Sequence, residues 1–180
     1  IEIFRTFDAL NDFDNIEFSI KEVKRIGKHA QGTIAYTTSP VHNLNTWLDL
    51  ARKIEDTGAD SLAIKDMAGL LRPFDAYDLV NSLKENLSIP IHMQTHATTG
   101  MSTATNMKAI EAGIDNIDTS ISSLSMTYGH TATETMLAIF EGQDREINLD
   151  LDSLEEVSIF FKEIREKYAE FEGGLKGVDS

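Results

Sequence analysis

An α/β fold with about five parallel strands is predicted by three features of this 180-residue sequence. Short apolar or alternating segments recur along the chain, and longer segments with helical periodicity lie between them. The units repeat roughly every 25 to 30 residues, which is typical of parallel βα units. The hydrophobic fraction of 41% is large enough to form a sizeable core.

Five segments are predicted to be strands, at 2–7, 32–36, 61–65, 89–95 and 116–121. Two of the helices between them are predicted to stop at Gly58 and Gly113, because glycine readily adopts the left-handed conformation just past a helix.

Three further helices are predicted. One covers 81–87 and is preceded by Pro73, and another covers 131–142. The last is acidic and is predicted to begin at about Ser153, with Asp152 and Glu155 spaced as a capping box.

Two architectures compete for these elements, an open doubly wound sheet and part of a (β/α)8 TIM barrel. No glycine-rich nucleotide-binding loop follows a predicted strand, which disfavours the first. Polar residues gather instead where the predicted strands end, as barrel enzymes require: Asp8, Lys65, Asp66, His96, Asp118 and Ser120. We therefore predict a partial barrel with about five parallel strands, followed by a C-terminal helix. Because the chain opens without Met inside a predicted strand, we expect it to be a piece of a longer protein.

Composition excludes several classes of function. The chain has no cysteine, which rules out disulfides and thiolate chemistry and favours a reducing, cytoplasmic location. Its 30 acidic against 16 basic residues give a net charge of −14, which argues against nucleic-acid binding. No apolar run approaches the ~20 residues that span a bilayer.

The segment "IHMQTH" places His92, Gln94 and His96 on one face of a strand, because successive side chains alternate. Imidazoles two residues apart can share one metal ion such as zinc, manganese or cobalt, whereas a glutamine amide is a poor ligand for these ions. The competing interpretation, which an isolated histidine pair favours, is a hydrogen-bonded polar cluster.

Lys65 ends a strand that is apolar enough to be buried, and a buried unpaired ammonium is costly. Its partner is predicted to be Asp8 or another strand-end acid, since Asp66 should point to the opposite face. The more specific alternative is that the Lys65 amine reacts with CO2 to form a carbamate that can bind a metal. Arg5, near Asp8, could clamp a substrate carboxylate or form a structural salt bridge with Asp8.

Several segments together resemble the carboxyltransferase domain of biotin-dependent enzymes. They are "FRTFDALND", "GKHAQGTIAYTTSPVHNL", "ADSLAIKDMAGLLRP", "HMQTHATTGMSTATNMKAIEAG" and "DTSISSLSMTYGHTATE". That family includes the oxaloacetate decarboxylase alpha subunit, the carboxyltransferase subunit of two-subunit pyruvate carboxylases, and transcarboxylase. The resemblance extends over essentially the whole chain.

The resemblance implies that residues 1–142 form the last five βα units of the barrel and that 143–180 begin a helical region. It also implies a metal held by an Asp of the first barrel strand, a carbamylated Lys, and two His two residues apart. Lys65 matches the Lys and His96 the second His, whereas Gln94 stands where the family has its first His. The Asp would lie before Ile1. Lys65 and Arg5 are the expected catalytic residues, and Arg5 and Asp8 the expected substrate contacts.

The implied reaction moves a carboxyl group between oxaloacetate or pyruvate and biotin, with the metal stabilising the enolate of pyruvate. The implied partners are a separate biotin carrier domain, the missing N-terminal strands and a second copy of the chain. Membrane decarboxylase subunits are a further possible partner. The chain alone is expected to be inactive.

Two alternatives remain open. One is a Claisen-type lyase or synthase on a related metal barrel, which we would not expect to carry "IKDMAGLL". The other is a degenerate assembly domain in which Gln94 marks a lost metal.

Overall fold

A parallel five-stranded sheet in the order β1-β2-β3-β4-β5 forms the centre of the computed structural model, which describes residues 1–145 and 147–173. The strands are β1 (Ile3–Thr6), β2 (His29–Ala35), β3 (Ser61–Asp66), β4 (Ile91–Thr95) and β5 (Asn116–Ile117). All five predicted strands are present. Strand β5 is shorter than predicted because the chain leaves the sheet after Ile117, and only an isolated bridge joins Ser120 to Ala132.

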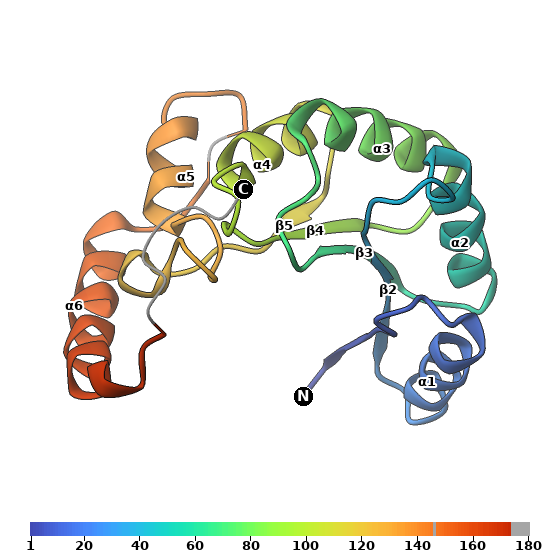
Figure 1. The fold of residues 1–180 in the computed structure, drawn as a ribbon, viewed down its shortest axis with the longest axis horizontal. Coiled ribbons are helices and arrows are strands. Elements are labelled where there is room, and N and C mark those ends of the chain that lie inside the picture. Colours follow the sequence, from blue (N-terminus) through green and yellow to red (C-terminus); the bar gives the residue numbers. More distant parts are fainter. Residues whose placement is uncertain (146, 174–180) are drawn as a thin grey trace.

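Helices α1 (Phe13–Arg25), α2 (Leu44–Asp56), α3 (Pro73–Asn86) and α4 (Ser102–Glu111) lie on the outer side of the sheet, which curves into an arc (Figure 1). Helices α5 (Thr133–Phe140) and α6 (Leu151–Lys167) and the short 3-10 helices η1 (Ser122–Leu124) and η2 (Ala169–Phe171) follow beyond β5. Gly58 and Gly113 follow α2 and α4 with φ of +88° and +95°, as predicted for glycines that end helices.

The hydrophobic core lies between the sheet and helices α1 to α4. Alternate side chains of β4, Ile91 and Met93, are fully buried and belong to one apolar cluster with Ile54 of α2 and Leu83 of α3. Burying one such side chain contributes about 1.5 to 3 kcal/mol. The stability of the fold therefore comes mainly from the outer face of the sheet.

The inner face of the sheet carries polar side chains. Strand pairing sets Lys65 of β3 beside Ala35 of β2 and Gln94 of β4, and all three side chains point to this face. The same face of β2 holds Gln31 and Thr33. Polar groups that the core does not use are thus collected on the concave side.

An ion pair between the two ends of the sheet shows that the sheet is curved. Arg5 of β1 donates from Nη1 and Nη2 to the carboxylate of Asp118, directly after β5, at 2.5 and 3.3 Å. Strands lie about 4.8 Å apart, so a flat five-stranded sheet would separate its edges by about 19 Å. An Arg and an Asp cannot bridge that distance, so the sheet must curl like part of a cylinder.

Helix α6 begins two residues earlier than predicted. Asp150 is its N-cap and accepts hydrogen bonds from the backbone N–H of Ser153 at 2.9 Å and from its hydroxyl at 2.6 Å. The predicted capping box of Asp152 and Glu155 is therefore wrong, because an aspartate three residues before Ser153 already caps this backbone. Residues 174–180 of the predicted helical region lie outside the described residues.

Helix α6 joins the rest of the chain through η1. The hydroxyl of Ser158 lies 2.7 Å from that of Ser122, and Arg165 donates to the carbonyl of Ser123 at 2.9 Å. Among the described helices, none has both the length and the apolar character to cross a membrane.

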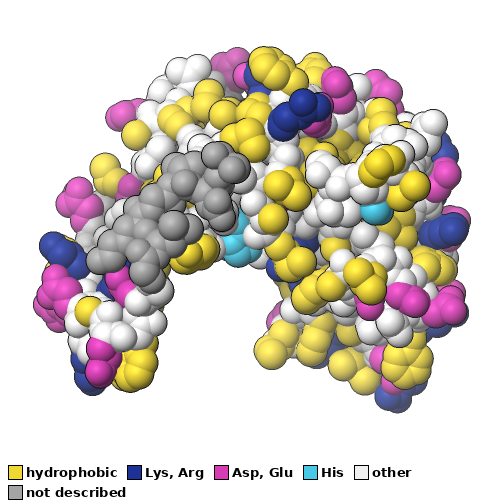
Figure 2. Space-filling model, viewed as in Figure 1, with side chains coloured by type: hydrophobic (Ala, Val, Ile, Leu, Met, Phe, Trp, Pro, Cys, Tyr) yellow, Lys and Arg dark blue, Asp and Glu magenta, His cyan; other side chains and the backbone are white. Residues whose placement is uncertain are grey.

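The open edge at β1 leads to a first prediction, that the isolated chain self-associates. Ile3 is 58% exposed and Phe7 50%, and Figure 2 shows hydrophobic side chains gathered at the end of the arc that carries β1 and α1. An unpaired apolar edge strand is a template for association. In sedimentation velocity at micromolar concentration we expect dimers or larger species.

Ile3→Lys should shift the sedimentation distribution toward monomer, because it places a charge on the edge. Val41→Lys is the matched control, since Val41 is 72% exposed but lies in a loop away from that edge. A monomeric unmodified chain would contradict the prediction.

Candidate active site

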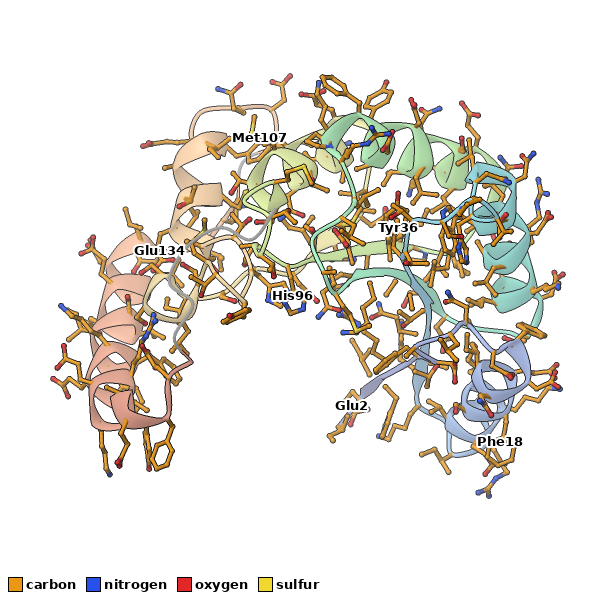
Figure 3. All side chains as sticks on the ribbon, viewed as in Figure 1. Glu2, Phe18, Tyr36, His96, Met107 and Glu134 are labelled. Carbon is orange, nitrogen blue, oxygen red and sulfur yellow. The ribbon has the colours of Figure 1, made fainter. Side chains whose placement is uncertain are left out.

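The candidate site lies on the concave face, where the strands end. Figure 3 shows His96, directly after β4, pointing into the hollow of the arc. Gln94 lies on the same face, and its amide oxygen accepts a hydrogen bond from the Nζ of Lys65 at 2.8 Å. The predicted shared face of Gln94 and His96 is therefore confirmed, and Lys65 lies on it with them.

Lys65 has a neutral partner where an acidic one was predicted. Its Nζ contacts the Gln94 amide and lies 5.0 Å from the centre of the Phe7 ring, a cation–π distance. Burial lowers the pKa of Lys65, the positive charge of Arg5 lowers it further, and Asp118 opposes the shift. The fraction of neutral, nucleophilic amine is thereby raised.

Asp118 is the charged centre of the inner face. Its carboxylate accepts from Arg5 and lies 2.6 Å from Nε2 of His92, while the Nε of Arg5 donates to the Gln31 amide oxygen at 2.5 Å. Burial alone would raise the pKa of Asp118, but the hydrogen bonds and charges of His92 and Arg5 outweigh it and hold the pKa well below its usual range. Sequence reasoning noted Asp118 only as a polar residue near a strand end.

Of the two alternatives for Arg5, the salt bridge with Asp8 is wrong. Asp8 begins the exposed turn before α1, where its carboxylate accepts from the backbone of Leu10 and Asp12 and from the Asn15 side chain. These bonds lower the pKa of Asp8. Arg5 uses all three guanidinium nitrogens on Asp118 and Gln31, so it presents no free fork for a substrate carboxylate.

The polar row of β4 is divided between two partners. His92 lies against Asp118, whereas Nδ1 of His96 lies 2.6 Å from the carbonyl oxygen of Tyr128. The ring of His130 packs at 4.4 Å from that of His96, centre to centre. Burial lowers the pKa of His130, and the neighbouring His96 lowers it further. His130 was missed because it comes from a loop whose path the sequence does not indicate.

Asp66 lies on the opposite face from Lys65, as predicted, and is fully buried. Its carboxylate accepts from the backbone N–H groups of Leu70 and Leu71 at 2.8 and 3.0 Å and from the hydroxyl of Thr95 at 2.9 Å. Burial raises the pKa of Asp66 despite these bonds. This residue therefore ties the loop after β3 to the end of β4, on the side of the sheet away from the concave face.

Comparison with known proteins finds similarity to an HMGL-like family model and to carboxyltransferases. A family model described as HMGL-like matches residues 6–160. The chain is 46% identical to a pyruvate carboxylase subunit of Methanocaldococcus jannaschii, over 93% of this chain and 30% of the relative. It is 47% identical to the methylmalonyl-CoA carboxyltransferase 5S subunit of Propionibacterium freudenreichii subsp. shermanii, over 96% of this chain and 34% of that relative. The chain thus spans about a third of the length of these curated relatives.

The fold is also similar to solved structures. The carboxyl transferase domain of Rhizobium etli pyruvate carboxylase, solved with pyruvate, superposes with a TM-score of 0.97 at 34% identity, over 100% of this chain and 32% of that one. The same domain has been solved with oxamate and biotin. The predicted partial (β/α)8 barrel and the predicted resemblance are both confirmed.

Asp118→Asn should destabilise the fold by about 1 to 3 kcal/mol at pH 7, because it leaves Arg5 without its anionic partner. The folded pKa of Asp118 is depressed, so its contribution is fully present above the unfolded pKa of about 3.9, decreases as the pH falls below that value and is lost only as the pH passes the depressed folded pKa. The difference from the unmodified chain should therefore shrink in acid. Urea unfolding at pH 7 and pH 3 measures this, with exposed Asp78→Asn as the control. Equal stability of both variants at pH 7 would contradict it.

Proposed function

Because the chain belongs to the HMGL-like family, we propose that it forms part of a biotin-dependent carboxyltransferase. The reaction moves a carboxyl group between oxaloacetate or pyruvate and biotin. Support comes from relatives named for pyruvate carboxylation and carboxyl transfer, and from a structural neighbour solved with pyruvate. The proposed partner is a biotin carrier domain, because another structure of that neighbour holds biotin.

One observation carries the proposal for this chain: Lys65 lies on the concave face with a lowered pKa and a neutral partner. The ammonium first loses one proton to water, and the neutral amine then attacks the carbon of CO2 and loses a second proton to water, so that a cation becomes an anionic carbamate. The Lys65 side chain then ends in negatively charged carbamate oxygens, where it had carried a positively charged ammonium nitrogen. An acid partner in contact with Nζ would have held the ammonium form, so the amide of Gln94 suits this chemistry.

The family implies a divalent metal, and the residues present fit one in part. His96 supplies an imidazole, and a carbamate on Lys65 would supply an anionic oxygen. The amide oxygen of Gln94 is a weak ligand for zinc or cobalt and suits manganese better. Among the residues that the structure describes, no three His, Cys, Asp or Glu side chains stand close enough to hold a metal. When bound, such an ion would polarise the keto oxygen of the substrate and stabilise the enolate.

Arg5 and Asp118 act on Lys65 through their charges. The guanidinium of Arg5 favours the neutral amine, and the carboxylate of Asp118 holds that guanidinium in place. After carbamate formation the same positive charge stabilises the new anion. We therefore propose Arg5 as a residue that tunes Lys65, in place of the predicted substrate clamp.

A second function has one observation in its favour. Gln94 stands where the family has a metal-binding His, which fits a degenerate domain that serves assembly. Metal content separates the two: a first-row divalent ion that depends on Lys65 and His96 supports catalysis, and an empty site supports assembly.

Lys65→Arg tests the carboxyl transfer. In the natural protein that carries this chain, supplied with biotin, the rate of pyruvate formation from oxaloacetate should fall on the order of a hundredfold or more. The 13C signal of a carbamate formed with 13CO2 should also disappear. Lys53→Arg is the matched control, because Lys53 lies 5.7 Å over the Phe13 ring but on the helical side. A fully active Lys65→Arg variant would refute the proposal.

Gln94→His should raise the affinity for zinc or cobalt by about tenfold or more, because an imidazole replaces a weak amide ligand. Isothermal titration of the metal-free protein measures the affinity. Gln143→His, which adds a histidine at an exposed position, controls for non-specific binding. Unchanged affinity in Gln94→His would count against Gln94 as part of the site.

A further inference from the structure

The loop after β5 contacts His96 through its backbone. Nδ1 of His96 lies 2.6 Å from the carbonyl oxygen of Tyr128, and the N–H of Ala97 donates to the carbonyl of Gly129 at 2.9 Å. A carbonyl oxygen can only accept, so Nδ1 must carry the proton. In the neutral ring Nε2 then holds the lone pair.

This loop is strained and closed on itself. Met126 and Thr127 have φ of 62° and 49°, a left-handed conformation that non-glycine residues rarely adopt. Two backbone hydrogen bonds hold the turn: Met126 N–H to the His130 carbonyl and Gly129 N–H to the Met126 carbonyl, both at 2.8 Å. Strain of this kind costs of order 1 to 3 kcal/mol per residue and persists where the surroundings enforce it.

Gly129 permits the close approach. A Cβ at this position would lie 2.7 Å from the carbonyl oxygen of Leu124 and 3.2 Å from that of Met126, and both neighbours are backbone atoms. Any larger residue must therefore shift the turn. The same turn presents the Tyr128 carbonyl to His96 and sets the His130 ring against it.

We propose that the turn 124–130 is a positioning element that fixes His96 in the Nδ1–H tautomer and presents Nε2 to the concave site as an electron-pair donor. Tyr128 acts through its carbonyl and Gly129 through its lack of a side chain. Both are positioning residues, since they act on the concave face through His96. The proposal rests on the proposed function only for what Nε2 binds, because the tautomer itself is a property of the protein alone.

Nitrogen-15 magnetic resonance of the histidine-labelled protein tests this directly, in the natural protein at pH 8.5, where an ordinary imidazole with a pKa of about 6.5 is neutral. The His96 signal is assigned by its loss in His96→Gln. We expect one tautomer, with the proton on Nδ1. A proton on Nε2 of His96, or a mixture of both tautomers in the unmodified protein, would overturn the proposal.

Gly129→Ala tests the role of the turn. It should produce a mixture of tautomers and lower the affinity for a divalent metal such as Mn²⁺ by about tenfold, the lower end of the effect of removing a partner that orients a metal-binding histidine. Gly173→Ala is the matched control, because a Cβ there meets nothing within 4 Å. If His96 keeps a single Nδ1–H tautomer in Gly129→Ala, the turn does not fix the tautomer and the proposal is wrong. An Nδ1–H tautomer with no metal binding in any variant would support the positioning and refute the metal site.

Discussion

The ion pair between Arg5 and Asp118 is the constraint on which the rest of the structure depends. It joins the two edge strands of the sheet, at residues 113 positions apart in sequence, and it can form only if the sheet curls. The same pair brings His92 and Gln31 into one polar network and places a positive charge near Lys65. The ion pair therefore links the curvature of the fold to the electrostatics of the site.

The outer face of the sheet contributes most of the stability, and the inner face carries the polar groups of the candidate site. Side chains that point outward, such as Ile64 and Met93, are fully buried against the helices and provide the hydrophobic free energy. Side chains that point inward, such as Lys65 and Gln94, contribute little apolar burial. A substitution at Lys65 or Gln94 can change chemistry at small cost to the fold, whereas a substitution at Asp118 also removes the ion pair that joins the two ends of the sheet.

Strands, their order of occurrence and the faces of their side chains could be predicted, because a period of two residues is local information. The shared face of Gln94 and His96 and the opposite face of Asp66 both followed from it. Partners across the sheet could not be predicted in this way. Proximity in sequence favoured Asp8 for Arg5, but Asp8 is committed to the turn before α1, and the true partner comes from the other end of the sheet. His130 and Tyr128 were missed for the same reason, since a strained turn brings them to His96.

The neutral side chain of Gln94 bears on two functions, metal binding and the hydrogen bonding of Lys65. An imidazole at this position would be the stronger metal ligand, but it would not offer Lys65 the carbonyl-type acceptor that it has here. The amide oxygen accepts a hydrogen bond from the ammonium without adding charge, so it satisfies Lys65 before modification and leaves its pKa free to fall. If Lys65 becomes a carbamate, the amide N–H2 of the same side chain can turn to donate to the new oxygen, because glutamine carries both an acceptor and two donors. Glutamine at this position would thus be a weaker metal ligand than histidine, and it leaves Lys65 without a charged partner in contact.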